Sequence, residues 1–204
     1  MSPARQQQPA PVLLVDVMDT LVSEPFYGEL PAFFGMTFEE LLAAKEPRTW
    51  IDFELGTMEE AEFTRRFFRD RRAVDGAALR NHMQQSYRWL DGMEALMVEL
   101  HAAGHEMHAL SNYPAWWELI EEKLRLSRFL QWSFVSCLTG VRKPDPEAFH
   151  GAARALGRPT GECLFIDDRP GNVEAAEAAG MRALLRTDTP GLRTELVGLG
   201  LLPG

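Results

Sequence analysis

The chain has few cysteines, no excess of basic residues and no long hydrophobic run. Cys137 and Cys163 both lie in apolar stretches that we expect to be strands, and their spacing matches no metal-binding pattern, so two reduced core thiols are expected. The net charge of −9 at pH 7 comes without a basic stripe, which argues against nucleic acid as a partner. No segment is long enough to span a bilayer, and the apolar run after residues 1–11 is too short for a signal peptide. We therefore expect a soluble cytoplasmic protein without a membrane partner.

Apolar residues make up 46% of the 204-residue chain, which is ample for a buried core. From Gly92 onward, short apolar strands alternate with helices, several of which are followed by glycine. Strands of this kind, separated by helices, predict a parallel sheet covered on both faces. The expected strands are 12–17, 106–110, 134–138, 163–166 and 182–185, and the helices between the later strands are 93–103, 114–126, 146–156 and 173–179.

Residues 23–90 follow a different pattern, in which aromatic and other apolar residues recur at three- and four-residue steps without a convincing strand. The first strand must pair with strands that come after this segment, so the segment is expected to be a helical insertion. The predicted fold class is α/β, with a parallel sheet between helical layers and an inserted helical cap. The predicted core is 11–22 and 91–204, and the predicted cap is 23–90.

Polar residues follow four of the expected strands. They are Asp16 with Asp19, Ser111 with Asn112, Lys143, and Asp167 with Asp168. The carboxyl ends of parallel strands are where ligands bind in open sheets, so these groups are expected to converge on one crevice. Carboxylates gathered there repel one another unless a cation lies between them, and Mg²⁺ prefers oxygen ligands.

This set of residues suits phosphoryl transfer through an aspartyl intermediate. Asp16 would attack phosphorus, Ser111 would hold a phosphate oxygen, and Lys143 would offset the negative charge. Asp168, aided by Asp167, would fix Mg²⁺ between Asp16 and the phosphate. Each residue also has a structural alternative, because acids and hydroxyls at strand ends commonly cap helices or form turns. The adjacent acids Asp167 and Asp168 are harder to explain in that way, since they need a counter-charge.

These motifs resemble those of the haloacid dehalogenase superfamily of hydrolases. The likeness spans nearly all of residues 12–187 and rests on four segments: 15–21 (hydrophobic-Asp-x-x-x-Thr-Leu), 110–112 (Leu-Ser-Asn), 140–146 (Gly-Val-Arg-Lys-Pro-Asp-Pro) and 165–172 (Phe-Ile-Asp-Asp with a later Asn). The resemblance implies a Rossmann-like three-layer core with a small helical cap, and it is nearest the branch of epoxide-hydrolase-linked and sugar-phosphate phosphatases. The site residues that it implies or that the strand ends suggest are Asp16, Asp19, Ser111 and Lys143 for catalysis, Ser111, Asn112 and Lys143 for substrate binding, and Asp16, the Met18 carbonyl, Asp167 and Asp168 for Mg²⁺.

One position departs from the family pattern. Family phosphatases usually carry a second Asp two residues after the nucleophile, which protonates the leaving group and later activates water, but this chain has Met18 there. Asp19 occupies the next position, where a side chain on an extended backbone would point to the other face. A bend after the strand would let Asp19 take the acid–base role, and otherwise it is a turn-stabilising acid.

We therefore predict a Mg²⁺-dependent phosphatase of small phosphate esters that is slow or restricted to good leaving groups. General acid–base catalysis contributes roughly 10²- to 10⁴-fold, and its loss hurts most where the leaving group needs a proton. Two alternatives stay open, a metal-independent 2-haloacid dehalogenase and a non-catalytic member that binds phosphate or metal. Tyr27, Lys45, Arg48 and Trp50 are the cap residues considered for substrate selection. The sequence names neither the substrate nor the oligomeric state.

Overall fold

Five parallel strands form one sheet in the order β3-β2-β1-β4-β5 in the computed structural model, which describes residues 10–204. The strands are β1 (Val12–Val15), β2 (Met107–Ser111), β3 (Gln131–Val135), β4 (Cys163–Asp167) and β5 (Arg182–Leu185). All four neighbouring pairs are parallel, and β1 pairs with both β2 and β4. Their polar ends therefore meet at one edge, and the predicted α/β class is confirmed.

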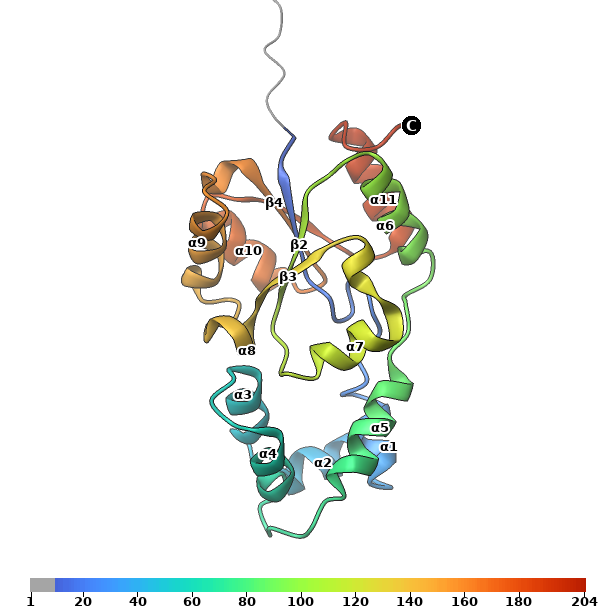
Figure 1. The fold of residues 1–204 in the computed structure, drawn as a ribbon, viewed down its shortest axis with the longest axis vertical. Helices are drawn as coiled ribbons and strands as arrows, with labels where there is room; N and C mark the ends of the chain where they lie inside the picture. Colours follow the sequence, from blue (N-terminus) through green and yellow to red (C-terminus); the bar gives the residue numbers. More distant parts are fainter. Residues whose placement is uncertain (1–9) are drawn as a thin grey trace, which may run out of the picture.

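Helices cover both faces of the sheet (Figure 1). On one side lie α9 (Pro146–Ala155) and α10 (Pro170–Ala178), and on the other lie α6 (Met93–Ala102), α7 (Trp117–Leu124) and α11 (Thr189–Gly198). Successive residues of β1 point to opposite faces, as in any strand. Leu14 packs in the cluster with α9 and α10, whereas Leu13 and Val15 belong to the larger cluster on the other face.

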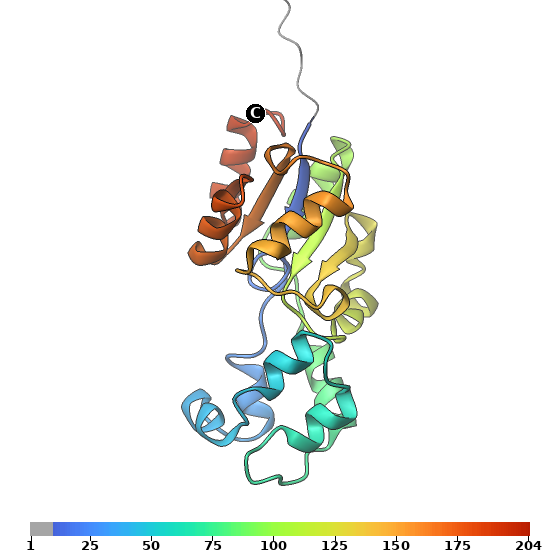
Figure 2. The same cartoon turned by 90° about the vertical axis from the view of Figure 1, so that its left-hand side faces the viewer.

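Residues 23–90, which we call the cap, lie beyond the carboxyl ends of the strands (Figure 2). The cap helices are α1 (Glu29–Phe33), α2 (Phe38–Ala44), α3 (Thr49–Glu54), α4 (Glu60–Arg66) and α5 (Gly76–Ser86). The chain passes from core to cap near Val22 and returns near Trp89, and these two connecting segments pair with each other. Val22 forms an antiparallel bridge with Trp89, and the Leu90 amide donates to the Leu21 carbonyl at 2.9 Å. The division of the chain at these crossings stays a prediction, and this pairing supports it.

Aromatic packing joins the cap to the sheet. Trp116, which follows β2, is fully buried and makes edge-to-face contacts with Phe53 and Phe63 of the cap at centroid distances of 5.3 and 5.4 Å. The two phenylalanine rings stack on each other at 4.5 Å. The cap therefore shares one hydrophobic cluster with the sheet face that it adjoins.

The strand predicted at 134–138 is wrong in its position. The strand is Gln131–Val135, and Ser136–Thr139 form a short helix, α8, that ends at Gly140 with φ +71°. Two 3-10 turns, η1 (Leu126–Arg128) and η2 (Thr160–Glu162), precede β3 and β4. Because β3 is an edge strand with partly buried residues, its polar start lacked the apolar run that marks the central strands. Cys137 therefore lies in α8 rather than in a strand, and both cysteines are free thiols.

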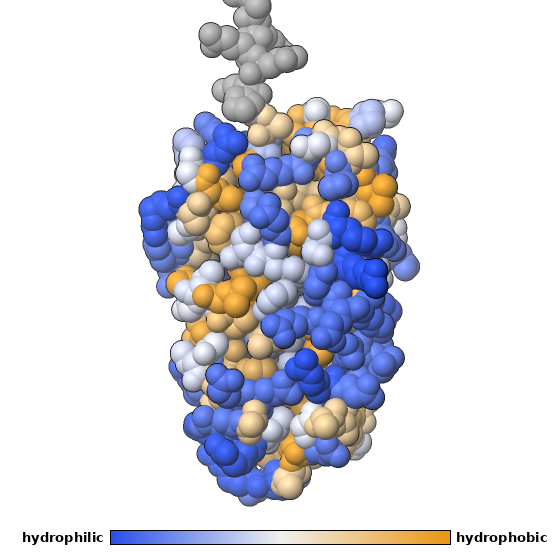
Figure 3. Space-filling model, viewed as in Figure 1, coloured by the Kyte–Doolittle hydropathy of each residue, from blue (hydrophilic) through white to orange (hydrophobic). Residues whose placement is uncertain are grey.

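None of the helices among residues 10–204 is long and apolar enough to cross a membrane. The face drawn in Figure 3 is mostly hydrophilic, with hydrophobic patches scattered between polar side chains.

Candidate active site

The candidate site lies where the carboxyl ends of β1 and β4 meet, on the side of the sheet that faces the cap (Figure 2). After β1, the chain places β2 and then β3 on one side of it. It then returns to the other side of β1 and adds β4 and β5 there, so the strand order reverses between β1 and β4. Ligands of open parallel sheets bind in the crevice at such a point. Asp16 directly follows β1, and Asp167 is the last residue of β4.

Lys143 links these two acids. Its Nζ donates to Asp16 Oδ1 at 2.7 Å and to Asp167 Oδ2 at 2.6 Å, and the side chains are buried. Although burial alone would lower the pKa of Lys143, the charges of Asp16 and Asp167 raise it above the ordinary value. The ammonium group therefore stays charged and offsets part of the negative charge at the strand ends.

Asp167 is held on all sides by hydrogen bonds. The side-chain amide of Asn172 donates to both carboxylate oxygens at 3.1 and 3.0 Å, and the Arg169 amide donates to Oδ1 at 2.8 Å. Together with Lys143, these donors leave Asp167 little capacity for a further ligand. Asp168 is only half buried and is the freer of the two predicted metal ligands from β4.

Three carboxyl groups still lie close enough to share one cation. Asp16, Asp167 and Asp168 each offer an oxygen within 4.8 Å of the others. Burial raises the pKa of Asp16 to about 6 against the opposing charge of Lys143, and burial and the neighbouring Asp167 raise the pKa of Asp168. Thr20 Oγ1 donates to Asp16 Oδ2 at 3.2 Å and lies 3.5 Å from Asp168 Oδ1. Repelling oxygens that are desolvated together fit a hard divalent ion such as Mg²⁺.

Ser111 supplies an unused donor at the end of β2, the strand that pairs with β1. It is the last residue of β2, its side chain is buried, and its hydroxyl has no hydrogen-bond partner among residues 10–204. Buried hydroxyls are rarely left unpaired, so this group fits an anionic oxygen of a ligand.

A cavity of about 50 Å³ lies over these groups. Its lining residues are Asp16, Met18, Glu24, Glu54, Asn112, Arg142, Lys143, Arg169 and Asn172. The cavity has room for a few water molecules or one phosphoryl group. Glu24 and Glu54 line it from the cap, and the sequence analysis missed both.

None of the four cap residues considered for substrate selection lines this cavity. The hydroxyl of Tyr27 accepts a hydrogen bond from Arg169 at 3.2 Å, and the indole of Trp50 donates to Glu54. Lys45 is buried away from the cavity, and Arg48 is exposed and pairs with Asp52 at 3.4 Å. Tyr27 and Trp50 therefore act on the cavity only through the residues that line it.

Glu24 lines the cavity, and no cationic side chain among residues 10–204 forms an ion pair with it. Its Oε1 accepts the Phe26 amide at 2.9 Å, and its own amide donates to Asp19 Oδ1 at 2.9 Å. Burial is the main cause that raises the pKa of the Glu24 carboxyl to about 8. Its position after the first motif was visible in the sequence, but nothing in the local pattern indicated that it lines the same cavity as Asp16.

Asp19 lies beside the site, but its carboxylate is bound to the Glu24 amide rather than lining the cavity. The backbone does bend after β1, because Asp19 has φ +51°, a left-handed conformation that few residues other than glycine adopt. The acid–base role considered for Asp19 stays a prediction, and this geometry favours the turn-stabilising interpretation.

Glu54 is committed to a cap–core junction. Its Oε2 lies 2.7 Å from Arg142 Nη2, and its backbone carbonyl accepts the Ser136 hydroxyl at 2.6 Å. Burial raises the pKa of Glu54, whereas Arg142 opposes that rise. The Glu54–Arg142 ion pair thus closes one side of the cavity.

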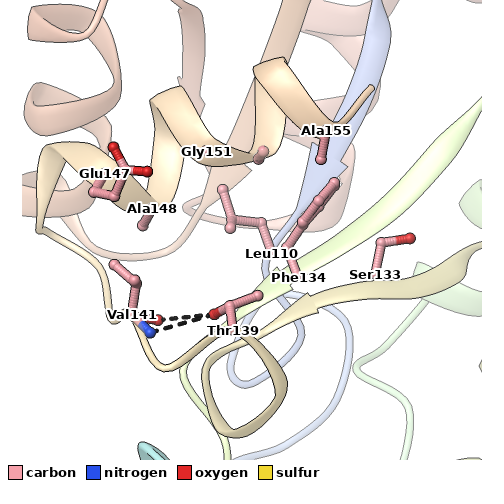
Figure 4. A pocket seen from close by; sticks show the side chains of 10 residues that line it. Leu110, Ser133, Phe134, Thr139, Val141, Glu147, Ala148, Gly151 and Ala155 are labelled. Carbon is pink, nitrogen blue, oxygen red and sulfur yellow. Dashed lines mark hydrogen bonds between the residues drawn. The ribbon is translucent and has the colours of Figure 1, made fainter. Parts of the chain in front are cut away.

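A second pocket, of about 310 Å³, lies between α9 and β3 (Figure 4). Its lining is largely apolar, with Leu110 and Phe134 pointing from the sheet toward α9 and Ala155 contributed by α9 itself. None of the residues that surround Asp16 lines it, so it is separate from the candidate site.

Comparison with known proteins identifies the family. A family model described as haloacid dehalogenase-like hydrolase matches residues 13–180. Flavin mononucleotide hydrolase 1 of Arabidopsis thaliana, a protein named as chloroplastic, is 47% identical over 191 residues, which cover 94% of this chain and 78% of that protein. A phosphoglycolate phosphatase of Pseudomonas savastanoi is 32% identical over 92 residues, which cover 44% of this chain and 34% of that enzyme.

Solved structures agree on the fold. A haloacid dehalogenase family enzyme of Bacteroides thetaiotaomicron has a TM-score of 0.74 and 18% identity, with 91% of this chain and 99% of that chain covered. The same enzyme has been solved with magnesium and inorganic phosphate. With a family model that spans most of the sequence and a relative that matches 94% of it, the chain belongs to the haloacid dehalogenase-like hydrolases, as its motifs predicted.

Proposed function

We propose that this hydrolase is a Mg²⁺-dependent phosphatase that cleaves small phosphate monoesters through a phosphorylated Asp16. The observation that carries the proposal is the arrangement at the strand ends, in which a charged Lys143 pairs with Asp16 after β1 and the unpaired Ser111 hydroxyl ends the neighbouring strand β2. The names of the Arabidopsis and Pseudomonas relatives support the substrate class, because both act on phosphate esters.

Asp16 is suited to attack phosphorus at neutral pH. A pKa of about 6 leaves its buried carboxyl mostly ionised at pH 7. One oxygen then attacks phosphorus while Lys143 offsets the charge that gathers on the nucleophile and the transferring group. The Ser111 hydroxyl donates a hydrogen bond to a phosphate oxygen. Phosphoryl transfer depends mainly on such positioning and charge neutralisation.

Asp16, Asp168 and the backbone carbonyl of Met18 would hold the Mg²⁺ ion. When bound, Mg²⁺ supplies positive charge to the phosphoryl oxygens and to the nucleophile. Asp167 was also predicted as a ligand, and its saturated hydrogen bonds favour a role in orienting Lys143 instead. The Bacteroides enzyme, which shares this fold, has been solved with magnesium and inorganic phosphate, and this supports a magnesium-dependent phosphate site.

The substrate is proposed to be a small-molecule phosphate ester whose phosphoryl group enters the 50 Å³ cavity. A leaving group as large as that of flavin mononucleotide does not fit in this space, so such a substrate needs the cap to open. The Glu54–Arg142 and Tyr27–Arg169 contacts between cap and core would break on opening. A cytoplasmic location stays a prediction, since the Arabidopsis relative is named as chloroplastic.

Hydrolysis of p-nitrophenyl phosphate by the purified protein tests this proposal. We expect turnover that needs Mg²⁺ and that disappears in Asp16→Asn. Asp70→Asn, which changes an exposed acid of the cap, serves as the matched control and should retain the wild-type rate. Equal rates for wild type and Asp16→Asn would refute the enzymatic role of this site.

The two alternative functions predict other outcomes in the same assay. A 2-haloacid dehalogenase would release chloride from a 2-chloroacid without metal, and a non-catalytic protein would bind phosphate or Mg²⁺ without turnover. No described residue specifically favours carbon–halogen cleavage, and the acid pair Asp167–Asp168 suits a cation better.

A further inference from the structure

Among the residues that the motifs predict for catalysis, none is placed to protonate a leaving alkoxide. Met18 stands two residues after Asp16, its thioether cannot exchange a proton, and it belongs to the hydrophobic core cluster. Lys143 is tied to two carboxylates, and Asp19 faces the Glu24 amide. A phosphatase that acts on alkyl esters therefore needs another acid in the cavity.

Two further carboxyl groups line the cavity, Glu24 and Glu54. Glu54 is engaged by the guanidinium of Arg142 and the indole of Trp50, so its charge is already used at the cap–core junction. Glu24 has one oxygen bonded to the Phe26 amide, and its other oxygen has no hydrogen-bond partner among residues 10–204. Glu24 also has no ion-pair partner within that part of the chain.

We propose that Glu24 is the general acid and base of this enzyme and takes the place of the acid that Met18 does not provide. The inference rests on the proposed phosphatase function of the same site. Glu24 and Asp16 both line the same cavity of about 50 Å³, so a phosphoryl group bound to Asp16 there has Glu24 as a neighbouring acid for its leaving oxygen.

The chemistry balances in two steps. In the first, an Asp16 oxygen bonds to phosphorus, the ester P–O bond breaks, and the carboxyl proton of Glu24 passes to the leaving oxygen to give the alcohol. In the second, the Glu24 carboxylate takes a proton from water as that water attacks phosphorus, and the bond between phosphorus and Asp16 breaks. Phosphate leaves, and both side chains return to their starting forms.

The surroundings keep Glu24 protonated at neutral pH. Burial raises its pKa to about 8, the Phe26 amide opposes this, and the carboxylates of Asp19 and Glu54 raise the pKa further, whereas Arg169 lowers it. The other titratable groups nearby are the buried phenols Tyr87 and Tyr113, which hydrogen-bond each other at 2.8 Å and whose pKa values are raised by burial. Both phenols stay neutral, so they do not compete for the proton.

Asp19 is a positioning residue in this arrangement. Its carboxylate accepts the Glu24 amide, and its carbonyl accepts Arg186 Nη1 at 3.1 Å, so the turn between β1 and the cap is fixed at both ends. The left-handed backbone at Asp19 directs the chain back toward the cavity. Asp19 thus positions Glu24 and does not itself protonate the leaving group.

The test compares Glu24→Gln with wild type on an alkyl phosphate, flavin mononucleotide, and on p-nitrophenyl phosphate, whose leaving group departs without a proton. We expect kcat for the alkyl ester to fall roughly 10²- to 10⁴-fold. With the aryl ester, Glu24→Gln should release one nitrophenolate per site in a burst and then turn over slowly, because the phosphorylated Asp16 accumulates. Glu39→Gln, an exposed cap acid of the same type, is the matched control and should behave as wild type.

Two measurements separate catalysis from a structural role. The basic limb of the kcat/KM profile for the alkyl ester should have a midpoint near pH 8 in wild type and be absent in Glu24→Gln. In Asp16→Asn labelled with ¹³C-glutamate, the Glu24 carboxyl signal should titrate near the same pH. An alkyl-ester rate and pH profile unchanged in Glu24→Gln, or equal losses on both esters without a burst, would overturn the role of Glu24 while Asp16-dependent turnover upholds the phosphatase. Absence of Asp16-dependent turnover in wild type would overturn both.

Discussion

The side-chain amide of Asn112 pairs with the backbone of Lys143 in both directions. Asn112 Nδ2 donates to the Lys143 carbonyl, and the Lys143 amide donates to Asn112 Oδ1, each at 2.8 Å. Asn112 follows β2, whereas Lys143 lies in the loop after α8, so this pair of bonds fixes the loop to the sheet. Asn112 was predicted to bind substrate, and it lines the cavity, but both polar atoms of its amide already bond to the backbone of Lys143 and so position that residue.

Replacing Asn112 should therefore reduce catalysis without abolishing it. In Asn112→Ala the Lys143 backbone loses both bonds, so the ammonium group is held less firmly against Asp16, and we expect kcat to fall roughly 10- to 100-fold. The measurement is steady-state turnover of p-nitrophenyl phosphate with Mg²⁺. Asn81→Ala, at an exposed cap position, should leave kcat unchanged. A purely substrate-binding Asn112 would instead raise KM with little change in kcat.

Measurements of metal binding should distinguish the roles of the two adjacent acids at the end of β4. Saturating wild type with Mg²⁺ at 100 times its Kd should raise the free energy of unfolding by about 2.7 kcal/mol. Asp168→Asn should lose this increase and keep the metal-free stability. Asp167→Asn should lower the metal-free stability by about 3 to 5 kcal/mol, because it breaks a buried pair with Lys143. Thermal or urea unfolding with and without Mg²⁺ measures both, and the reverse assignment would make Asp167 the ligand.

Gly56 should be intolerant of a side chain. It has φ +69°, and an added Cβ would collide with the backbone carbonyl of Cys137 in α8. Gly35 has φ +65° with no atom near an added Cβ, so it matches the backbone strain without the collision. We expect Gly35→Ala to cost about 1 to 2 kcal/mol of unfolding free energy and Gly56→Ala about 3 kcal/mol or more. Urea unfolding measures both, and equal losses would show that α3 and α8 do not need this close approach.

The partly buried Glu24 should make stability fall as pH rises. Its pKa is about 8 in the folded protein and 4.5 as the ordinary value, so between these pH values the native state holds a proton that the unfolded chain has released. Each pH unit in that window lowers the free energy of unfolding by up to about 1.4 kcal/mol, and the fall ends above pH 8. In the metal-free Glu24→Gln variant, this pH dependence of the free energy of unfolding should be absent.

Unfolding of wild type and Glu24→Gln across that pH range gives the measurement. The difference should be near zero at pH 4 and should grow to roughly 3 to 5 kcal/mol in favour of Glu24→Gln at pH 9. Glu39→Gln should follow wild type at every pH. A constant difference would mean that Glu24 ionises normally in the folded protein.

The local pattern predicted the three central strands to within two residues at either end, but it misplaced the edge strand β3. β1, β2 and β4 are buried along their length, and their apolar runs mark them clearly. β3 begins with Gln131, which is exposed, so the apolar run 134–138 was shifted toward α8. An edge strand is covered less than a central one, and its pattern is weaker for that reason.

The sequence by itself determined the parallel sheet and the convergence of Asp16, Ser111 and Asp167, because strand periodicity and the direction of parallel strands place those residues at one edge. Only the tertiary structure decided which carboxyl groups are bonded, which are paired with a cation and which are buried alone. Asp167 and Asp168 are neighbours in the chain, yet Asp167 is saturated with donors whereas the side chain of Asp168 accepts only a long hydrogen bond from Thr20 among residues 10–204. Glu24 and Glu39 have the same side chain, but only Glu24 is enclosed by residues of the cap and the core, whereas Glu39 is exposed. The protonation and pairing of these carboxyl groups depend on their burial and on contacts between segments far apart in the chain. No local sequence pattern carries that information.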